Sequence, residues 1–139
     1  MLETFETAAK AIADPSRARI LKLLEGGELC VCQITTVLAL APATVSKHLA
    51  VLKTAGLLQQ RRDGKWIYYR LADRKLNPYA RPLLGLLAGV LGDDPTIAED
   101  RRVLAMVNAI PLQILCDQGR AALPADNRAA ADSCCGGPP

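Results

Sequence analysis

The pattern that most limits the fold of this chain is a pair of short helices joined by a tight break. Apolar spacing predicts one helix over residues 30–38 and a second over 42–53, with Leu40-Ala41-Pro42 between them. The apolar side of the second helix recurs at three- and four-residue intervals, at Val45, Leu49 and Leu52. The face opposite this stripe is polar at its N-terminal end. Two such helices around a tight turn predict a helix-turn-helix.

A hairpin pattern follows this pair directly. Gly56 ends the second helix, and strands are predicted over 57–61 and 66–71. Asp63-Gly64 stands between the strands, and this dipeptide favours a two-residue turn because it tolerates the backbone angles that the turn needs. The sequence therefore predicts a mainly α fold with a small β-hairpin wing, the winged helix-turn-helix.

The rest of the chain is predicted to be helical up to a C-terminal tail. Further helices are expected over 2–12, over 15–25, from 78 to about 91, and from 95 onwards with an apolar stripe to Ile114. Pro111 either kinks or ends the last of these. A chain of 139 residues fits one domain, which we place at 1–116, and a flexible Cys-containing tail rich in small residues follows at 117–139.

Positive charge collects on the helix-turn-helix and the hairpin. The whole chain carries +3, but residues 41–71 hold six Lys or Arg against Asp63 alone, a local charge of +5 that leaves −2 for the remainder. Such a patch is typical of a phosphate-binding surface, the alternative being a solvated face with extra lysines. The residues expected to contact DNA lie on the second helix and at the hairpin tip: Thr44, Ser46, Lys47, His48, Lys53, Arg61, Arg62 and Lys65. Trp66 and Tyr68 are expected to pack within the wing.

The sequence predicts neither a membrane span nor an export signal. The longest apolar run, 83–91, is far shorter than the roughly 20 residues that cross a bilayer, and the acidic N-terminus has no apolar core of signal-peptide length. We therefore expect a cytoplasmic protein with no membrane partner. In a reducing cytoplasm, the five cysteines are expected to be free thiols, metal ligands or redox switches and not a disulfide framework.

Two of the thiols stand one residue apart in Glu28-Leu29-Cys30-Val31-Cys32, at the predicted start of the first helix of the pair. The positive end of a helix dipole stabilises a thiolate, which is the form that binds soft ions. Small buried apolar side chains are the alternative role for such cysteines. Because the pair stands beside Glu28 at the helix mouth and not on the apolar stripe, the sequence favours reactive thiols.

These motifs together resemble the ArsR/SmtB family of winged-helix repressors, and specifically its arsenic-responsive members. The segments that carry the resemblance are Asp14-Pro15-Ser16-Arg17-Ala18-Arg19-Ile20-Leu21, Glu28-Leu29-Cys30-Val31-Cys32, Val45-Ser46-Lys47-His48-Leu49, Arg61-Arg62-Asp63-Gly64-Lys65 and Tyr68-Tyr69-Arg70-Leu71. The resemblance covers residues 5–72 well and the C-terminal helices loosely. It implies a homodimer, formed through the first and the C-terminal helices, that binds double-stranded operator DNA. It also implies release of that DNA when As(III) or Sb(III) binds Cys30 and Cys32.

One position departs from the pattern of the arsenic-responsive relatives. Some of them carry a third cysteine where this chain has Thr35, so a three-thiolate site needs a ligand from elsewhere. The remaining candidates are Cys116, and Cys134 and Cys135 in the tail, from either subunit. A lone cysteine late in an amphipathic helix, as Cys116 is, is expected more often in a core or an interface. The His-based zinc site of other relatives is absent, since His48 is the only histidine. The N-terminal cysteine site of the cadmium and lead sensors is absent too, since no cysteine precedes Cys30.

The spacing of Cys30 and Cys32 predicts how binding would act on the DNA-reading helix. Residues i and i+2 of an ideal helix point about 200° apart, whereas two sulfurs that share one ion must lie close together. If both cysteines belong to the helix, binding has to unwind or bend its first turn. That distortion would then move the second helix.

Two other functions would use the same residues. A thiol-redox sensor would respond to oxidation of the cysteine pair, and a soft-metal carrier or interaction module would use the fold without DNA. The sequence contains no Ser-His-acid arrangement, no paired carboxylates in a defined setting and no phosphate-cradling glycine loop. We therefore do not expect an enzyme, and we expect no organic cofactor.

Overall fold

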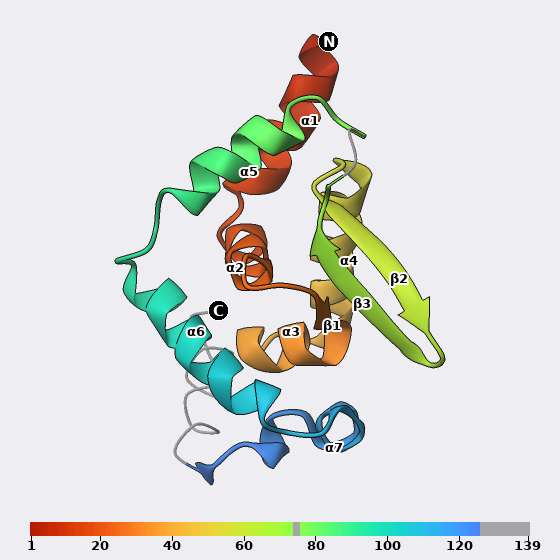
Figure 1. Ribbon diagram of the computed structural model, residues 1–139, viewed down its shortest axis with the longest axis vertical. Coiled ribbons are helices and arrows are strands. Elements are labelled where there is room, and N and C mark those ends of the chain that lie inside the picture. Colours follow the sequence, from red (N-terminus) through yellow and green to blue (C-terminus); the bar gives the residue numbers. More distant parts are fainter. Residues whose placement is uncertain (74–75, 126–139) are drawn as a thin grey trace.

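The computed structural model describes residues 1–73 and 76–125, and within them the chain is mainly helical with one small sheet (Figure 1). The elements in chain order are α1 (Leu2–Ala13), α2 (Pro15–Leu24), β1 (Leu29–Cys30), α3 (Val31–Leu38), α4 (Pro42–Thr54), β2 (Leu58–Asp63), β3 (Trp66–Leu71), α5 (Ala80–Ala88), α6 (Pro95–Asn108), α7 (Leu112–Gln118) and a 3₁₀ turn, η1 (Gly119–Ala122). This arrangement confirms the predicted fold class.

Helices α3 and α4 form the predicted helix-turn-helix. The chain leaves α3 at Ala39, whose left-handed backbone (φ 57°) lets its N–H donate to the Thr35 carbonyl, and α4 opens with Pro42 at its first position. The two helix axes differ by 116°. The apolar stripe of α4 is fully buried, as its spacing predicts: Val45, Leu49 and Leu52.

The wing is an antiparallel hairpin of β2 and β3. It closes at the Asp63↔Trp66 pair, so the two-residue loop is Gly64-Lys65, one residue later than the predicted Asp63-Gly64 turn. Gly64 has a positive φ (61°), a conformation that glycine adopts without strain at the first position of such a loop. The sheet has a third strand that sequence reasoning did not find. Strand β1 pairs antiparallel with β3, with Leu29 opposite Tyr69 and Cys30 opposite Tyr68, so the strand order is β1-β3-β2.

The last two α-helices, α6 and α7, lie against α3 (Figure 1). The predicted last long helix is in fact two helices, since Pro111 lies between α6 and α7 as the N-cap of the second. Both helices pack against α3. The helix predicted to run from 78 to about 91 is shorter, Ala80–Ala88, and lies beside α1.

The prediction that a flexible tail begins at residue 117 is wrong for the residues that follow it directly. The 3₁₀ turn η1 continues the ordered chain, and Leu123 after it is buried in the core. The Arg120 guanidinium (Nη2) also donates to the Val37 carbonyl at 3.0 Å. Two contacts hold residues 119–123 against the rest of the fold. Leu123 buries apolar surface, and the Arg120 cation lies at the negative end of the α3 dipole. Cys134 and Cys135 lie outside the described residues.

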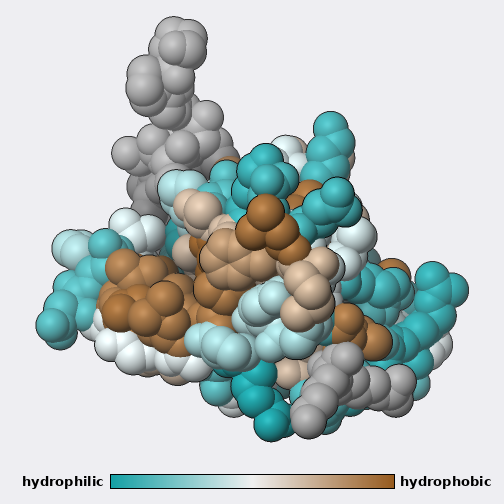
Figure 2. Space-filling view, turned by 90° about the horizontal axis from the view of Figure 1, so that it is seen from above, coloured by the Kyte–Doolittle hydropathy of each residue, from teal (hydrophilic) through white to brown (hydrophobic). Residues whose placement is uncertain are grey.

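Apolar side chains gather on the end of the molecule formed by α1 and α5, seen from above in Figure 2. The exposed large apolar residues on α1 and on the stretch around α5 are Met1, Leu2, Phe5, Leu76, Leu86, Val90 and Leu91. In the described part of the chain, no single helix has both the length and the apolar character to cross a membrane, and only the bent pair α3–α4 meets that criterion when taken together.

Candidate thiolate site and nucleic-acid interface

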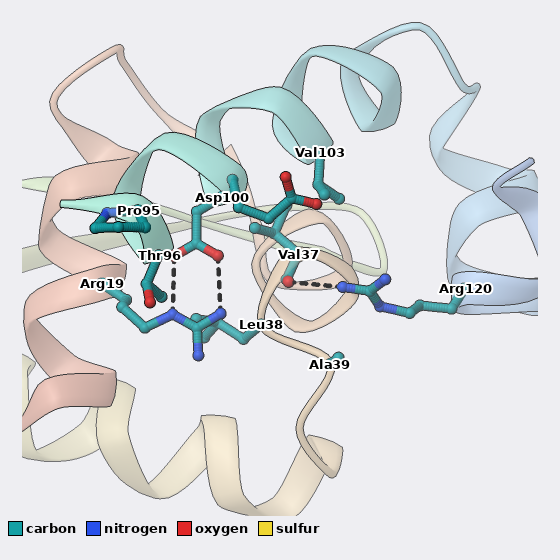
Figure 3. A pocket seen from close by; sticks show the side chains of 10 residues that line it. Arg19, Val37, Leu38, Ala39, Pro95, Thr96, Asp100, Val103 and Arg120 are labelled. Atoms are coloured by element: carbon teal, nitrogen blue, oxygen red, sulfur yellow. Dashed lines mark hydrogen bonds and ion pairs between the residues drawn. The ribbon is translucent and has the colours of Figure 1, made fainter. Parts of the chain in front are cut away.

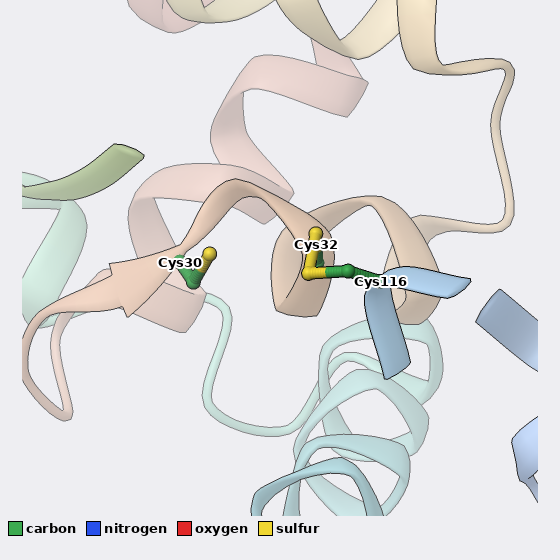
Figure 4. A group of neighbouring side chains, drawn as sticks. All are labelled: Cys30, Cys32 and Cys116. Carbon is green, nitrogen blue, oxygen red and sulfur yellow. A yellow bond between two sulfur atoms is a disulfide. The ribbon is translucent and has the colours of Figure 1, made fainter. Parts of the chain in front are cut away.

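Three cysteines from three different elements converge on one point (Figure 4). Cys30 ends β1, Cys32 lies in the first turn of α3, and Cys116 lies on α7. Their Sγ atoms all lie within 4.8 Å of one another. A disulfide joins Cys32 to Cys116, whereas Cys30 is a free thiol with no exposed surface. Of the three roles expected for the cysteines, Cys30 is a free thiol in this structure, whereas the bond between Cys32 and Cys116 fits a redox switch and not a pair of free thiols.

Cys30 lies just outside α3, as its N-cap. The predicted unwinding assumed that both Cys30 and Cys32 belong to the helix, and this assumption is wrong. The backbone of Cys30 is extended (φ −74°, ψ 149°) and caps α3, and its N–H donates to the Gln33 side-chain oxygen at 2.8 Å. The Gln33 amide donates in turn to Asn108 at the end of α6. Because Cys30 is not helical, its sulfur already points toward that of Cys32, and no turn of α3 has to unwind to bring the two together.

Cys116 reaches the site because the chain changes direction at Pro111. Helix α7 starts there, and its buried Leu115 anchors it against the core, which leaves the neighbouring Cys116 half-buried beside Cys32. The sequence favours a core or interface role for Cys116. It does not predict that the sulfur of Cys116 lies close to those of Cys30 and Cys32. Pro111 was the available signal, but a helix break does not by itself tell where the next helix packs.

A pocket of about 360 Å³ opens beside Cys32 and Cys116. Its wall includes Pro42 and Ser46 from the first turns of α4. A ligand at these sulfurs would therefore lie next to the start of the helix that is expected to read DNA.

The donor set fits a soft three-coordinate ion when the disulfide is reduced. Thiolates are the ligands that soft centres prefer. Three sulfurs that each bind one ion at about 2.3 Å, the length of a zinc–thiolate bond, can all be at most about 4.0 Å apart, as in a planar trigonal site. The three Sγ atoms lie within 4.8 Å of one another, so shifts of about 1 Å would let all three share one ion once the disulfide is reduced.

The predicted DNA-contacting residues of α4 form an exposed row with one exception. Thr44, Ser46, Lys47 and Lys53 are all exposed. His48 is instead half-buried against the start of α2, with its Nδ1 3.4 Å from Arg17 Nη1 and 3.9 Å from Asp14 Oδ2. Asp14 also caps α2 by accepting the Arg17 backbone N–H at 3.1 Å. The position of His48 therefore serves the packing of α4 against α2 more than a contact with DNA.

The wing carries its three predicted cations in different settings. Arg62 is exposed, and the Lys65 ammonium lies 5.7 Å from the centre of the Trp66 ring. Arg61 donates to both oxygens of the Glu28 carboxylate, at 2.7–2.9 Å, and its guanidinium lies 4.4 Å from the centre of the Tyr68 ring. This hydrogen bond holds the pKa of Glu28 below its usual range and raises the pKa of Arg61. Sequence reasoning did not find Glu28 as a partner of the wing.

A second hollow, of about 290 Å³, lies between α2, α3 and α6 (Figure 3). Its main polar feature is the ion pair in which Arg19 Nε and Nη2 donate to the two Asp100 oxygens, each at 2.8 Å. Asp100 is only 4% exposed. No local sequence pattern predicts this pair, since the two residues are 81 positions apart. It ties α2 to α6 on the side of α3 that faces away from the wing.

Comparison with known proteins agrees with this architecture. The family profile described as "Bacterial regulatory protein, arsR family" matches residues 14–60, which span α2 to the start of β2. The arsenical resistance operon repressor of Escherichia coli is 37% identical over 105 residues, which cover 75% of this chain and 82% of that protein. The chain belongs to the arsR family. It is therefore a winged-helix transcriptional regulator and not an enzyme, as its sequence predicted.

Other members of the family extend the comparison. The arsenic resistance transcriptional regulator ArsR1 of Pseudomonas putida is 51% identical over 63 residues, but these cover only 45% of this chain and 49% of that protein. A homodimeric winged helix-turn-helix DNA-binding domain from Mycobacterium bovis, described as a possible ArsR-family transcriptional regulator, superposes with a TM-score of 0.55 at 34% identity. That superposition covers 63% of this chain and 78% of the other.

Proposed function

We propose that the protein is a homodimeric repressor that releases operator DNA when As(III) or Sb(III) binds the thiolates of Cys30, Cys32 and Cys116. The single observation that supports this most is the convergence of the three sulfurs within 4.8 Å, from three elements that meet at the helix-turn-helix. The names of the Escherichia coli and Pseudomonas putida relatives, both tied to arsenic resistance, point to the same class of inducer.

The chemistry requires the cysteines in their reduced form. A dithiol reductant supplies two electrons and two protons, which convert the Cys32–Cys116 disulfide to two thiols while the reductant becomes a disulfide. Three thiols then displace three hydroxyl groups from one molecule of arsenous acid, which forms three arsenic–sulfur bonds and releases three molecules of water. The chain supplies the three donors and holds Cys30 in place through the Gln33 side chain. Binding at these sulfurs would draw β1, α3 and α7 together.

The link to DNA is short on the side of α4. Pro42 and Ser46 line the same pocket as Cys32 and Cys116, so a change in the distance between α3 and α7 acts on the first turns of the recognition helix. We infer that Thr44, Ser46 and Lys47 contact operator phosphates or base edges, and that Arg62 and Lys65 contact the backbone from the wing. On this proposal the repressor binds operator DNA in the cytoplasm.

A homodimer would cover the apolar end of the molecule. The exposed apolar residues of α1 and of the stretch around α5 form a surface of the kind that subunit contacts bury. Two copies related by a two-fold axis would then present two recognition helices to the two halves of a pseudo-palindromic operator. The homodimeric state of the Mycobacterium bovis relative supports this arrangement.

The test is operator release by the reduced full-length protein, followed by fluorescence anisotropy on an operator selected from random-sequence DNA. Arsenite should weaken binding by the wild type about 100-fold or more, within the range that allosteric coupling reaches. Cys30→Ser, Cys32→Ser and Cys116→Ser should each lose most of this response. The double variant C134S/C135S is the matched control and should respond like the wild type.

Release that persists in Cys30→Ser and Cys32→Ser would refute a thiolate site at the start of α3. Release that is lost in C134S/C135S and kept in Cys116→Ser would instead move the third ligand to the tail.

The Cys32–Cys116 disulfide favours a second candidate function, thiol-redox sensing. Oxidation by a peroxide would remove two electrons and two protons from the two thiols. Hydrogen peroxide would become two molecules of water, and an organic hydroperoxide would become one alcohol and one water. This function needs Cys32 and Cys116 but not Cys30. Cys30→Ser therefore separates the two functions, because a redox sensor would keep its peroxide response and an arsenic sensor would lose its arsenite response.

A further inference from the structure

The cysteine site has a second connection to the DNA-binding surface, which runs through the sheet and not through α4. Cys30 faces Tyr68 on the neighbouring strand, and Tyr68 faces Arg61 on the next. A proposed ligand of the metalloid and a predicted DNA contact thus lie in one row across the three strands. The row takes one residue from each strand, so only β3 lies between β1 and β2.

Glu28 links β1 to the wing a second time, through a side-chain contact with Arg61. It lies two residues before Cys30 and just ahead of β1, and its carboxylate accepts from Arg61 Nε at 2.9 Å and from Nη2 at 2.7 Å. The Tyr68 ring also contacts this guanidinium, which lies 4.4 Å from the ring centre. The other acid near Arg61 is Asp63, whose oxygen is 3.9 Å from Nη1. Glu28 is therefore the main anionic partner of Arg61 among the described residues.

An arginine engaged by a carboxylate is a poor phosphate ligand. The bidentate contact uses one edge of the guanidinium fork, and the negative charge offsets the positive charge that would release counterions from DNA. In this structure Cys32 and Cys116 are joined, Cys30 on β1 is a free thiol, and Glu28 holds Arg61. A ligand that also binds Cys30 would add a restraint on β1, two residues after Glu28.

We propose that Glu28 is a positioning residue that couples the cysteine site to the wing. Closing the cluster around its ligand fixes β1, keeps Glu28 on Arg61 and withdraws that guanidinium from the operator phosphates. In the reduced, ligand-free repressor β1 is less restrained, and Arg61 exchanges Glu28 for a phosphate. This inference rests on the proposed function and adds to it the residue through which the wing takes part in release.

The salt dependence of operator binding tests the coupling. Each phosphate contact contributes about 0.9 to the slope of log affinity against log salt, so loss of Arg61 from both subunits should make the slope shallower by about 2. We therefore compare the slope of log affinity against log salt over a range of low salt concentrations. In the arsenite-loaded wild type this slope should be about 2 smaller in magnitude than in the ligand-free protein. In Glu28→Gln this difference should be close to zero, and the factor by which arsenite weakens binding should fall at least about 5-fold, the lower end of common allosteric coupling.

Glu99→Gln is the matched control. Glu99 forms an exposed pair with Arg102 on α6, with oxygen–nitrogen distances of 2.6 and 2.8 Å, and the substitution removes the same charge far from the sheet. It should leave both the slope difference and the release factor at wild-type values. A readout independent of DNA is hydrogen exchange of the Arg61 Nε–H by NMR. Arsenite should slow this exchange in the wild type and leave it unchanged in Glu28→Gln.

Three results would overturn the proposal. If the wild type releases operator and Glu28→Gln behaves identically, the coupling through Glu28 is wrong and the proposed function stands. If Glu99→Gln changes the slope and the release factor as much as Glu28→Gln does, the effect belongs to net charge and not to Arg61. If arsenite releases operator from no variant, including the wild type, the proposed function fails and the coupling fails with it.

Discussion

Asp100 is a carboxylate that the fold closes off from water almost completely, with 4% of its surface exposed. Removing a charged group from water is costly, and the two hydrogen bonds from Arg19 offset that cost only while both partners are present. The pair holds α2 to α6, and α6 in turn packs against α3. A single residue far from the sulfur atoms therefore helps to set the position of the helix that carries Cys32.

Asp100→Asn should lower the free energy of unfolding by about 3 kcal/mol, because it leaves the Arg19 charge without its carboxylate in a largely enclosed position. Urea unfolding followed by circular dichroism measures the change. Glu99→Gln, one residue earlier, affects an exposed pair and should leave the unfolding midpoint unchanged. Equal effects of the two substitutions would show that the Arg19–Asp100 pair does not stabilise the fold.

At the scale of elements, the join between the recognition helix and the wing depends on a glycine. Gly56 has φ 77°, and a Cβ built on it would lie 2.9 Å from the Asn77 Cβ and 3.3 Å from the Asn77 backbone nitrogen. Asn77 is buried there and donates from Nδ2 to the Ala55 carbonyl at 3.1 Å, which ties the end of α4 to the segment before α5. Both the backbone angle and the close approach therefore require glycine at this position.

Gly56→Ala should destabilise the protein by about 2–4 kcal/mol, the sum of left-handed strain and overpacking. Gly64→Ala at the wing tip is the control, since its φ is also positive (61°) but a Cβ there meets no atom within 4 Å. It should cost only the strain, about 1–2 kcal/mol. Thermal unfolding of both variants measures the difference, and equal losses would contradict the close contact with Asn77.

The elements that sequence reasoning predicted are those with a repeating signal. The apolar stripe of α4 carries its own periodicity and is found where it was expected. The Asp63-Gly64 signal locates the hairpin to within one residue, since the loop is Gly64-Lys65. Strand β1 was not predicted, because two residues are too few to show a period of two. The position of Cys116 was not predicted either, because it depends on the direction of the chain after Pro111, which packing determines.

The same limit applies to the contacts that connect elements. Cys30 and Cys32 were singled out from their spacing, and Arg61 from its charge. Glu28 as the partner of Arg61 needs the register of a strand pair that the sequence did not reveal. Where a contact joins residues through tertiary packing alone, local propensity contains no information on it.

For the whole molecule, the sulfur cluster lies where three chain segments meet. β1 connects it to the wing, α3 and its pocket connect it to α4, and α7 attaches the C-terminal segment, whose Arg120 also contacts α3. A ligand that ties the three sulfurs together would restrain all three segments at once. This geometry explains how one small ion could act on both the recognition helix and the wing.

The most direct test of the account is the number of sulfur neighbours of arsenic in the loaded, reduced dimer, measured by X-ray absorption at the arsenic edge. The wild type and C134S/C135S should both show three sulfurs and no oxygen. Cys116→Ser should show two sulfurs and one oxygen. Three sulfurs in Cys116→Ser, or two in the wild type, would contradict a site built from Cys30, Cys32 and Cys116.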